Sequence, residues 1–266
     1  LGRVTAMVRL QIVGGGRMGD ALLAGLLRGG WAPADVAVVE AVAERRDELA
    51  AAHPGVAVID TPVACEGAVV AVKPGDVDVV VAQVAAAGCR RVLSIAAGVT
   101  LGRLEAAAGP GVAVVRAMPN TPALVGAGAA AIAGGAAATD ADLGWAEGLL
   151  GSVGTVVRVP EAQLDAVTGL SGSGPAYVFL VAEALIDAGV LVGLPRPVAT
   201  ELATATLLGA ARLLTETDDD APALRAAVTS PGGTTAAGLQ QLERHAVRAA
   251  IADAVVAATA RSRELS

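Results

Sequence analysis

Residues 228–239, Val-Thr-Ser-Pro-Gly-Gly-Thr-Thr-Ala-Ala-Gly-Leu, combine hydroxyl side chains and glycines directly before a helix-like run at 236–248. Free backbone N–H groups at the start of a helix, flanked by Ser and Thr hydroxyls, form a binding site for a small carboxylate. An ordinary helix-to-helix turn capped by Ser or Thr has the same composition. The carboxylate site is favoured because a nucleotide-binding pattern opens the chain, and a cofactor site combined with an anion site indicates a redox enzyme.

The nucleotide-binding pattern is Gly14-Gly15-Gly16-Arg17-Met18-Gly19, which fits G-x-G-x-x-G. It follows an apolar run at 8–13 and precedes a helical pattern at 18–28, which is the context that the pattern requires. Gly14 would permit the tight turn, Gly16 the approach of the pyrophosphate, and Gly19 the close packing of helix on strand. The sequence therefore predicts a dinucleotide site at this turn.

The choice between NAD and NADP stays open. Glu40 ends the second predicted strand, where a carboxylate accepts hydrogen bonds from the adenosine ribose, and this favours NAD. Arg17, Arg45 and Arg46 are near enough in sequence to bind a 2′-phosphate, which favours NADP. Arg45 and Arg46 fit a solvated helix face at least as well.

Two further segments end predicted strands, at the edge where ligands of open parallel sheets bind. The segment Ala71-Val72-Lys73-Pro74 contains the only lysine of the chain, although chance retention of Lys73 is an alternative explanation. The segment 94–98, Ser-Ile-Ala-Ala-Gly, offers small residues against which a nicotinamide ring could pack.

Few residues are available as a proton donor. His53 lies beside a proline at a predicted helix end and His245 lies in a predicted C-terminal helix, and both are interpreted as structural or exposed. Neither a Ser/His/Asp arrangement nor a metal cluster stands out. Carbonyl reduction develops alkoxide charge and usually recruits a proton donor, whereas a protonated imine accepts hydride readily. A site of hydroxyls and backbone amides therefore favours C=N reduction, with positioning and carboxylate binding as the main tasks.

Short Val-rich runs alternate with longer helical patterns over the first 160 residues. Continuous apolar runs are typical of buried parallel strands. Strands are expected at 8–13, 36–40, 56–59, 68–72, 92–95 and 112–116, with helices at 18–28, 43–52 and 77–86. The sequence therefore predicts an α/β protein whose N-terminal part is a Rossmann-type doubly wound parallel sheet.

After Pro160 the sequence changes to long helical segments, at 176–192, 197–215, 223–228 and from 235 onward. We predict a dinucleotide-binding domain over residues 1–160 and an all-helical domain, for dimerisation and substrate binding, over residues 161–266. The helices are rich in Ala, Leu and Val, so one copy would expose much apolar surface and homo-oligomerisation is expected.

Composition argues against several partners. A formal charge of −7 and a content of two Trp, one Tyr and one Phe argue against nucleic acid. The longest uncharged stretch, 117–139, is broken by prolines and glycines, so no membrane span is expected there. Cys65 and Cys89 show no metal-ligand spacing, and nothing indicates a disulfide framework. Residues 1–6 lack signal-peptide features and are interpreted as an upstream extension before Met7, so the protein is expected in the cytoplasm.

Together the motifs resemble one family, pyrroline-5-carboxylate reductase, which catalyses the last step of proline biosynthesis. The similarity covers residues 9–265. The matching segments are 14–19, 71–74, 94–100, 116–122, 165–177, 228–239 and 261–265. The blocks at 165–177 and 228–239 are highly specific, whereas the glycine pattern is not.

The resemblance implies reduction of 1-pyrroline-5-carboxylate to L-proline by hydride transfer from NADPH or NADH. It also implies a helical C-terminal domain that interleaves into a homodimer, often assembled further into decamers, with the nicotinamide supplied by the other subunit. The loop residues that it implies for the substrate carboxylate are Ser230, Gly232, Gly233 and Thr234. Thr235 would bond the ring nitrogen, so that Ser230 and Thr235 are the catalytic candidates. The implied cofactor contacts are Val13, Gly14, Gly15, Gly16, Arg17, Met18, Ala71, Val72, Lys73, Pro74, Ile95, Ala96 and Ala97, beside Gly19 and Glu40 from the pattern itself.

Two positions depart from the family pattern. Glu40 stands where many members carry residues that tolerate a 2′-phosphate, so the usual NADPH preference is open here. Ala227 replaces an Asn with which some members contact the cofactor. Two other functions remain as alternatives: a different cyclic imine or keto-acid reductase of the same two-domain plan, and a non-catalytic oligomer that senses nucleotide or proline.

Overall fold

The computed structural model describes residues 8–265, which form two compact units. Unit 1 contains the described residues up to Ser173 together with those from Ala257 on, and unit 2 contains Gly174–Val256. The last turns of the chain group with unit 1, where the Ser262 hydroxyl donates to the Asp165 carboxylate at 2.7 Å. The domain boundary expected after residue 160 stays a prediction, and the interpretation of residues 1–6 concerns residues outside those described.

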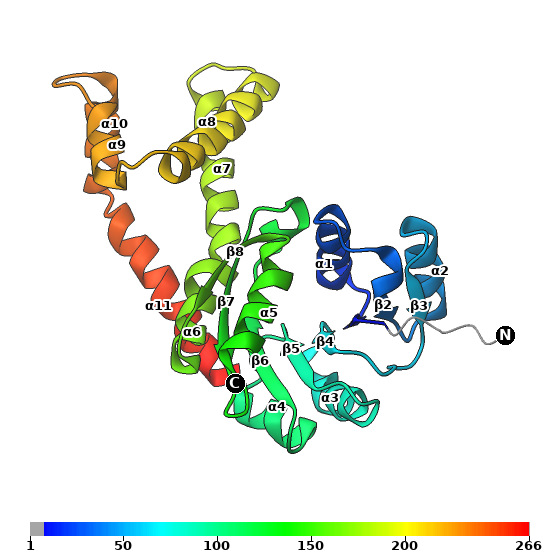
Figure 1. Cartoon of the computed structure of the whole chain (residues 1–266). Helices are drawn as coiled ribbons and strands as arrows, with labels where there is room; N and C mark the ends of the chain where they lie inside the picture. The colour runs from blue at the N-terminus through cyan, green and yellow to red at the C-terminus, as the bar shows by residue number, and fades with distance from the viewer. Residues whose placement is uncertain (1–7, 266) are drawn as a thin grey trace. The chain divides into compact units, whose positions relative to one another are not determined.

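Unit 1 is built on one eight-stranded sheet of order β3-β2-β1-β4-β5-β6-β7-β8 (Figure 1). The strands are β1 (Leu10–Val13), β2 (Val36–Val39), β3 (Ala57–Ile59), β4 (Gly67–Val70), β5 (Arg91–Ser94), β6 (Ala113–Met118), β7 (Gly128–Gly134) and β8 (Gly154–Arg158). The first six are mutually parallel, β7 is antiparallel to β6, and β8 is parallel to β7. The doubly wound parallel sheet predicted from the sequence is confirmed, and β7 and β8 extend it beyond the prediction.

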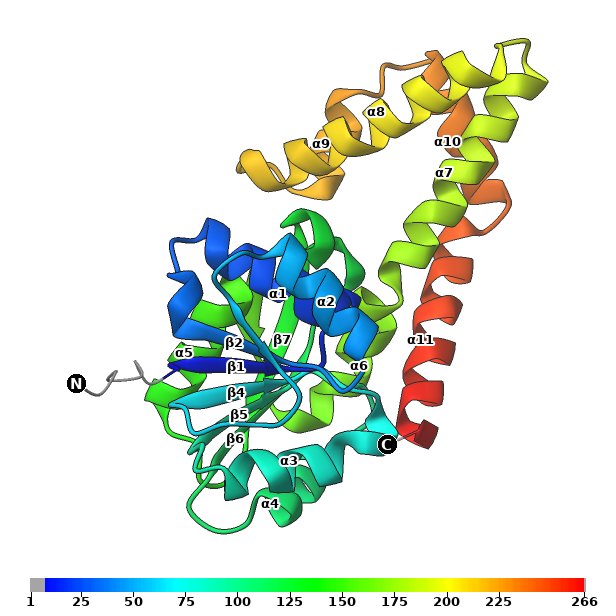
Figure 2. The same cartoon turned by 90° about the vertical axis from the view of Figure 1, so that its right-hand side faces the viewer.

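Helices cover both faces of this sheet. Figure 2 shows α1 (Arg17–Arg28) and α2 (Ala43–Ala52) over one face and α3 (Val77–Ala86) and α4 (Leu101–Ala108) beneath the other. α5 (Asp140–Gly151) shares its core with α1 and α2, and the short α6 (Leu164–Val167) shares its core with α3 and α4. Because every strand from β1 to β6 except β3 is buried on both sides, these sequences read as continuous apolar runs rather than as alternating ones.

The side chains of each strand alternate between the two cores. Leu10 and Ile12 of β1 enter the core beneath α1, α2 and α5, whereas Val13 enters the core on the other face. A one-residue shift in register would exchange these side chains, so the pairing Leu10↔Val36 on one side and Leu10↔Gly67 on the other is strongly specified. This register aligns the carboxyl ends of β1, β4 and β5 along one side of the sheet.

Unit 2 consists of α7 (Gly174–Leu191), α8 (Arg196–Glu216), α9 (Ala221–Ala227), α10 (Thr234–Arg244) and the first part of α11 (Val247–Leu265). α7 packs along α8, where a Cβ on Gly189 would lie 2.9 Å from the Cβ of Ala199. The continuous helix expected at 236–248 is wrong, because α10 ends at Arg244 and Ala246 has a φ of 53°, in the left-handed region. His245 therefore caps α10 instead of lying inside a long helix.

Unit 2 has little core of its own. Ala199 and Ala203 are the only buried residues among the described residues 174–256. Large apolar side chains are exposed instead, including Phe179 (62%), Leu191 (87%) and Leu208 (63%). One helical run of the described chain, Glu161–Leu191, is apolar and long enough to cross a bilayer by length and composition alone. It begins in unit 1, where Leu164 is buried, and only its part from Gly174 on belongs to unit 2.

Candidate functional site

The glycine turn between β1 and α1 is closed by backbone contacts. Gly14 has a φ of +104° and its N–H donates to the Val39 carbonyl at 2.8 Å. A Cβ on Gly14 would lie 2.6 Å from the Ala71 carbonyl oxygen, and one on Gly19 would collide with the Gly14 carbonyl oxygen. Gly16, the residue before α1, is exposed with open space around it. The first N–H groups of α1 therefore face a place where an anion can approach.

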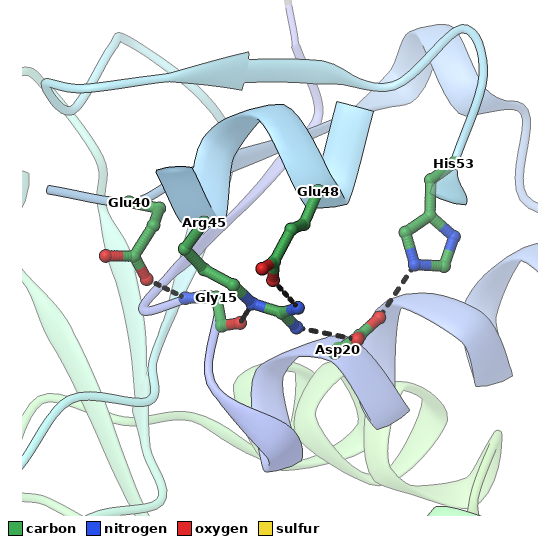
Figure 3. Close-up of polar contacts among 6 residues, drawn as sticks. All are labelled: Gly15, Asp20, Glu40, Arg45, Glu48 and His53. Carbon is green, nitrogen blue, oxygen red and sulfur yellow. Dashed lines mark hydrogen bonds and ion pairs between the residues drawn. The ribbon is translucent and has the colours of Figure 1, made fainter. Parts of the chain in front are cut away.

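Both backbone polar groups of Gly15 are held by side chains from the neighbouring strand end and helix (Figure 3). The Glu40 carboxylate accepts the Gly15 N–H at 2.9 Å and, through its other oxygen, the Val42 N–H at 2.9 Å. The Arg45 Nε donates to the Gly15 carbonyl at 2.8 Å. Glu40 thus lies at the predicted place, directly after β2, and it shapes the turn in this structure.

Arg45 continues into a network of charged groups. Its guanidinium donates to Asp20 of α1 and to Glu48 of α2, each at 2.8 Å. A further hydrogen bond of 2.7 Å joins the other carboxylate oxygen of Asp20 to the His53 Nε2 (Figure 3). The hydrogen bond to Glu48, together with Asp20 and against the opposing effect of burial, raises the pKa of Arg45. Arg45 is therefore a bridge between α1, α2 and the glycine turn, and the solvated helix face considered from the sequence does not describe it.

The other basic residues considered for a 2′-phosphate differ from Arg45. Arg46 donates from one nitrogen to the carbonyls of Glu40 at 2.9 Å and Ala41 at 2.8 Å. This places a guanidinium against the end of β2, beside the residue that would face the adenosine ribose. Arg17 is exposed in the first turn of α1.

The two remaining cofactor segments follow β4 and β5 at the same sheet edge. The Ala71 N–H donates to the Val13 carbonyl at 2.8 Å and the Ile95 N–H to the Val70 carbonyl at 3.1 Å, so the three strand ends are joined by hydrogen bonds. Lys73 is exposed and Ala96 is buried. The change in strand order, where β1 lies between β2 and β4, falls at this edge, and ligands of open α/β sheets bind at such a point.

The substrate candidates lie in unit 2, at the start of α10. Gly232 has a φ of +71°, and the Gly233 N–H donates to the Ser230 carbonyl at 3.1 Å, which closes a tight turn. The first bond within the helix runs from the Ala237 N–H to the Gly233 carbonyl at 3.2 Å. The N–H groups of residues 234–236 precede this bond and point out of the helix start.

The Ser230 hydroxyl lies against Gly233, because a Cβ on Gly233 would collide with the Ser230 Oγ. Ser230 and Thr234 are exposed and Thr235 is half-buried. The loop and the helix start thus bring hydroxyl-bearing residues and unpaired N–H groups into one short, largely exposed segment, as a site for a small carboxylate requires.

The structure gathers the predicted cofactor residues at one sheet edge of unit 1 and the predicted substrate residues in one loop of unit 2. Sequence reasoning missed the Asp20–Arg45–His53 network, although Asp20 in the first turn of a helix and two adjacent arginines in the next helix carried a signal. Within residues 8–265, no three His, Cys, Asp or Glu side chains gather as metal ligands.

Comparisons with known proteins agree with this arrangement. Residues 161–265 match the family model "Pyrroline-5-carboxylate reductase dimerisation", and residues 9–98 match "NADP oxidoreductase coenzyme F420-dependent". The C-terminal part is therefore the oligomerisation domain of its family. Pyrroline-5-carboxylate reductases of Mycobacterium tuberculosis and Synechocystis are each 46% identical, over 97% of this chain and 97% and 98% of theirs.

Solved structures give the same result. The pyrroline-5-carboxylate reductase of Coxiella burnetii superposes with a TM-score of 0.93 at 34% identity, over 98% of this chain and 99% of the other. The Plasmodium falciparum pyrroline carboxylate reductase, solved with NADP bound, gives a TM-score of 0.83 at 29% identity, over 97% and 98%. The chain belongs to the pyrroline-5-carboxylate reductase family.

Proposed function

We propose that this protein reduces 1-pyrroline-5-carboxylate to L-proline with hydride from NADPH or NADH, as the final step of proline biosynthesis. The observation that carries the proposal is the 46% identity to pyrroline-5-carboxylate reductases over 97% of this chain. The glycine turn and the helix start suited to an anion, both present in this chain, support it. A nicotinamide cofactor supplies the hydride when bound.

The residues of unit 1 bind and orient the cofactor in this proposal. The open N–H groups at the start of α1, after Gly16, hold the pyrophosphate. Glu40 faces the adenosine ribose, and the small residues at 95–97 leave room beside the nicotinamide ring. Arg45 fixes the Gly15 carbonyl, so the turn keeps its shape before the cofactor arrives.

The residues of unit 2 bind and orient the substrate. The Ser230 hydroxyl and the backbone around Gly232, Gly233 and Thr234 hold the carboxylate, because the helix start carries partial positive charge. The Thr235 hydroxyl bonds the ring nitrogen. The imine can be protonated before hydride transfer, so the residues of the loop have to position the C=N bond rather than supply a strong acid.

A direct assay tests the proposed function. Purified protein given 1-pyrroline-5-carboxylate and either reduced nicotinamide should oxidise the cofactor and form proline in equal amounts. A panel of six-membered cyclic imines and 2-oxo acids separates the alternative reductases. Cofactor binding in a fluorescence titration without turnover on any substrate would favour the non-catalytic alternative and reject the proposal.

We also propose a homodimer through the C-terminal helices that assembles further into a decamer, in the cytoplasm and without membrane or nucleic-acid partners. The exposed Phe179, Leu191 and Leu208 support association, because large apolar surface left exposed in one copy is typical of an interaction site. Light scattering on the purified protein would give the number of subunits.

A further inference from the structure

The two cysteines of the chain, Cys65 and Cys89, meet in the interior of unit 1. Their Sγ atoms lie 2.8 Å apart, and the side chains are 6% and 1% exposed. β4 and β5 are neighbouring parallel strands (Figure 2) with Ala68 paired to Val92, and both cysteines lie three residues before these partners. The two cysteines therefore lie in the segments that lead into neighbouring strands, with their Sγ atoms in contact.

Polar groups hold the two thiols in place. The Gln11 Nε2 donates to the Cys89 Sγ at 3.0 Å and to the Val63 carbonyl at 3.1 Å, while the Gln11 Oε1 accepts the Val63 N–H at 3.1 Å. The Cys65 Sγ lies 3.0 Å from the Gly67 carbonyl, which is a second acceptor, beside the Cys89 sulfur, for its single proton. Gln11 cannot turn without breaking its bonds to Val63, so its amide is fixed toward the Cys89 sulfur.

This arrangement makes the two thiols unequal. The hydrogen bond from Cys65, assisted by the Gln11 amide and against the effect of burial, lowers the pKa of Cys89 to about 7. The hydrogen bond to Cys89 and burial raise the pKa of Cys65. Cys89 is the better nucleophile at neutral pH, and Cys65 is the protonated neighbour that can react with it afterwards.

We propose that Cys65 and Cys89 form a modification site for hydrogen peroxide and other small hydroperoxides, at which the two thiols are converted reversibly into one intramolecular disulfide. The Cys89 thiolate attacks a peroxide oxygen, the O–O bond breaks, and Cys89 becomes a sulfenic acid. The other oxygen leaves as hydroxide and becomes water by taking up the proton that the Cys89 thiol lost on ionising. The Cys65 sulfur then attacks the Cys89 sulfur, the S–S bond forms, and the hydroxyl leaves as a second water with the Cys65 proton. Two thiols and one hydrogen peroxide give one disulfide and two water molecules.

The geometry favours the disulfide over further oxidation. Burial slows the first step, but after it the Cys65 sulfur is already in contact with the Cys89 sulfur, so the intramolecular reaction competes well against a second peroxide. The pair lies at the amino ends of β4 and β5. The predicted cofactor segments follow the carboxyl ends of the same strands, on the opposite side of the sheet. The oxidised protein is therefore expected to keep its reductase activity and to gain stability, because the new bond closes a loop in the unfolded chain.

The experiment treats the full-length protein with hydrogen peroxide and analyses it by intact mass and by thiol titration in denaturant. The expected result is a mass decrease equal to two hydrogen atoms, loss of both thiols, and a peptide that joins Cys65 to Cys89. Dithiothreitol should restore the starting mass. The thermal midpoint of the oxidised protein should rise by roughly 5–10 °C, and reductase activity should be retained.

Single variants provide the matched controls. Cys65→Ser should leave Cys89 to gain oxygen atoms on peroxide treatment, without the mass decrease or the rise in midpoint, and Cys89→Ser should react more slowly. Cys65→Ala serves if the serine variant does not fold. Three results would overturn the proposal: both thiols survive peroxide that oxidises free dithiothreitol, the wild type gains oxygen atoms instead of losing two hydrogens, or the thiols pair only between different chains.

Discussion

Thr235 is the second residue of α10, half-buried and directly after the exposed Ser230–Thr234 turn. Its backbone N–H belongs to the group that has no partner inside the helix, and its hydroxyl is a second donor from the same residue. In the proposed function, one residue therefore contacts the substrate twice, at the carboxylate and at the ring nitrogen.

Thr235→Ala should slow hydride transfer by roughly one to three orders of magnitude, the range for losing one positioned donor. The KM for the cofactor should change little, because unit 1 binds it. Single-turnover measurement of cofactor oxidation gives the rate, with Thr235→Ser as the variant that retains a hydroxyl and Thr215→Ala, on an exposed stretch of α8, as the unrelated control. Wild-type turnover in Thr235→Ala would remove this hydroxyl from the mechanism.

Glu40 has two roles, one toward the cofactor and one toward the glycine turn. Its carboxylate would lie beside a 2′-phosphate and repel it, yet it also accepts the Gly15 N–H at 2.9 Å. Glu40→Ser should therefore raise kcat/KM for NADPH relative to NADH by about tenfold, as expected for removal of one nearby like charge. Initial rates with both cofactors test this, with Glu44→Ser on the exposed face of α2 as the control. An unchanged ratio would show that Glu40 does not set the preference.

At the scale of elements, side chains link neighbouring helices and strands to the glycine turn. α1 and α2 are joined through Asp20, Arg45 and His53, and the same arginine holds the Gly15 carbonyl. Arg45 thus positions the glycine turn, and in the proposed function it acts on cofactor binding through this turn without touching the cofactor.

Arg45→Gln should raise the KM for the cofactor by about tenfold, since a turn that is no longer held must be ordered on binding, while kcat changes little. Arg45→Lys should recover part of the loss, because a lysine can reach one acceptor but not three. Steady-state kinetics with varied cofactor give both constants, and Arg28→Gln, at the exposed end of α1, is the matched control. A fall in kcat as large as the rise in the KM for the cofactor would indicate a general structural defect instead.

α5 is held to β5 through Asp142, which is 6% exposed. Burial alone would raise the pKa of Asp142, but hydrogen bonds from the Thr139 hydroxyl and N–H and from Arg91 at 2.7 Å outweigh it and lower this pKa. A carboxyl group whose pKa is lower in the folded state stabilises the protein above its ordinary pKa, and this contribution is lost as the pH falls through the lowered value.

Asp142→Asn should therefore reduce the free energy of unfolding at pH 7 by about 1–2 kcal/mol, since charged hydrogen bonds are replaced by neutral ones. The difference from wild type should shrink as the pH falls below about 4, the ordinary range for aspartate. Urea denaturation at several pH values measures it. A difference that stays constant down to acid pH would mean that the charge of Asp142 contributes nothing.

At the scale of the whole molecule, unit 1 has two full cores and unit 2 has almost none. A helical unit with Ala199 and Ala203 as its buried residues, among those described at 174–256, cannot be stable through its own apolar burial. Its helices must be covered by another copy of the chain, in agreement with the dimerisation family that residues 161–265 match.

Phe179→Asp should weaken the dimer by about 100-fold or more, the effect of losing one large apolar anchor and burying a charge. Size-exclusion chromatography with light scattering over a dilution series measures the change, and activity should fall with the dimer fraction. Val79→Asp, at a 62% exposed position of α3 in unit 1, is the control for an added surface charge. A variant that remains fully assembled would place Phe179 outside the interface.

The sequence by itself determined the features that depend on local rules. The glycine turn, the buried parallel strands, most helices of unit 2 and the loop from Ser230 to Thr235 each follow from residue types at short spacing, and the first three agree with the structure. β7 was not predicted, because Gly-Ala-Ala-Ala-Ile-Ala-Gly has weak strand propensity and becomes a strand through its pairing with β6. The break at Ala246 was likewise invisible in a helix-forming run.

Only the tertiary structure decided which distant side chains share a site. Arg45 looked like a surface residue and proved to hold the glycine turn, and two cysteines without any meaningful spacing proved to have their sulfur atoms in contact. The physical reason is that strand register and helix packing set these contacts, and both depend on the burial of the whole sheet rather than on neighbours along the chain.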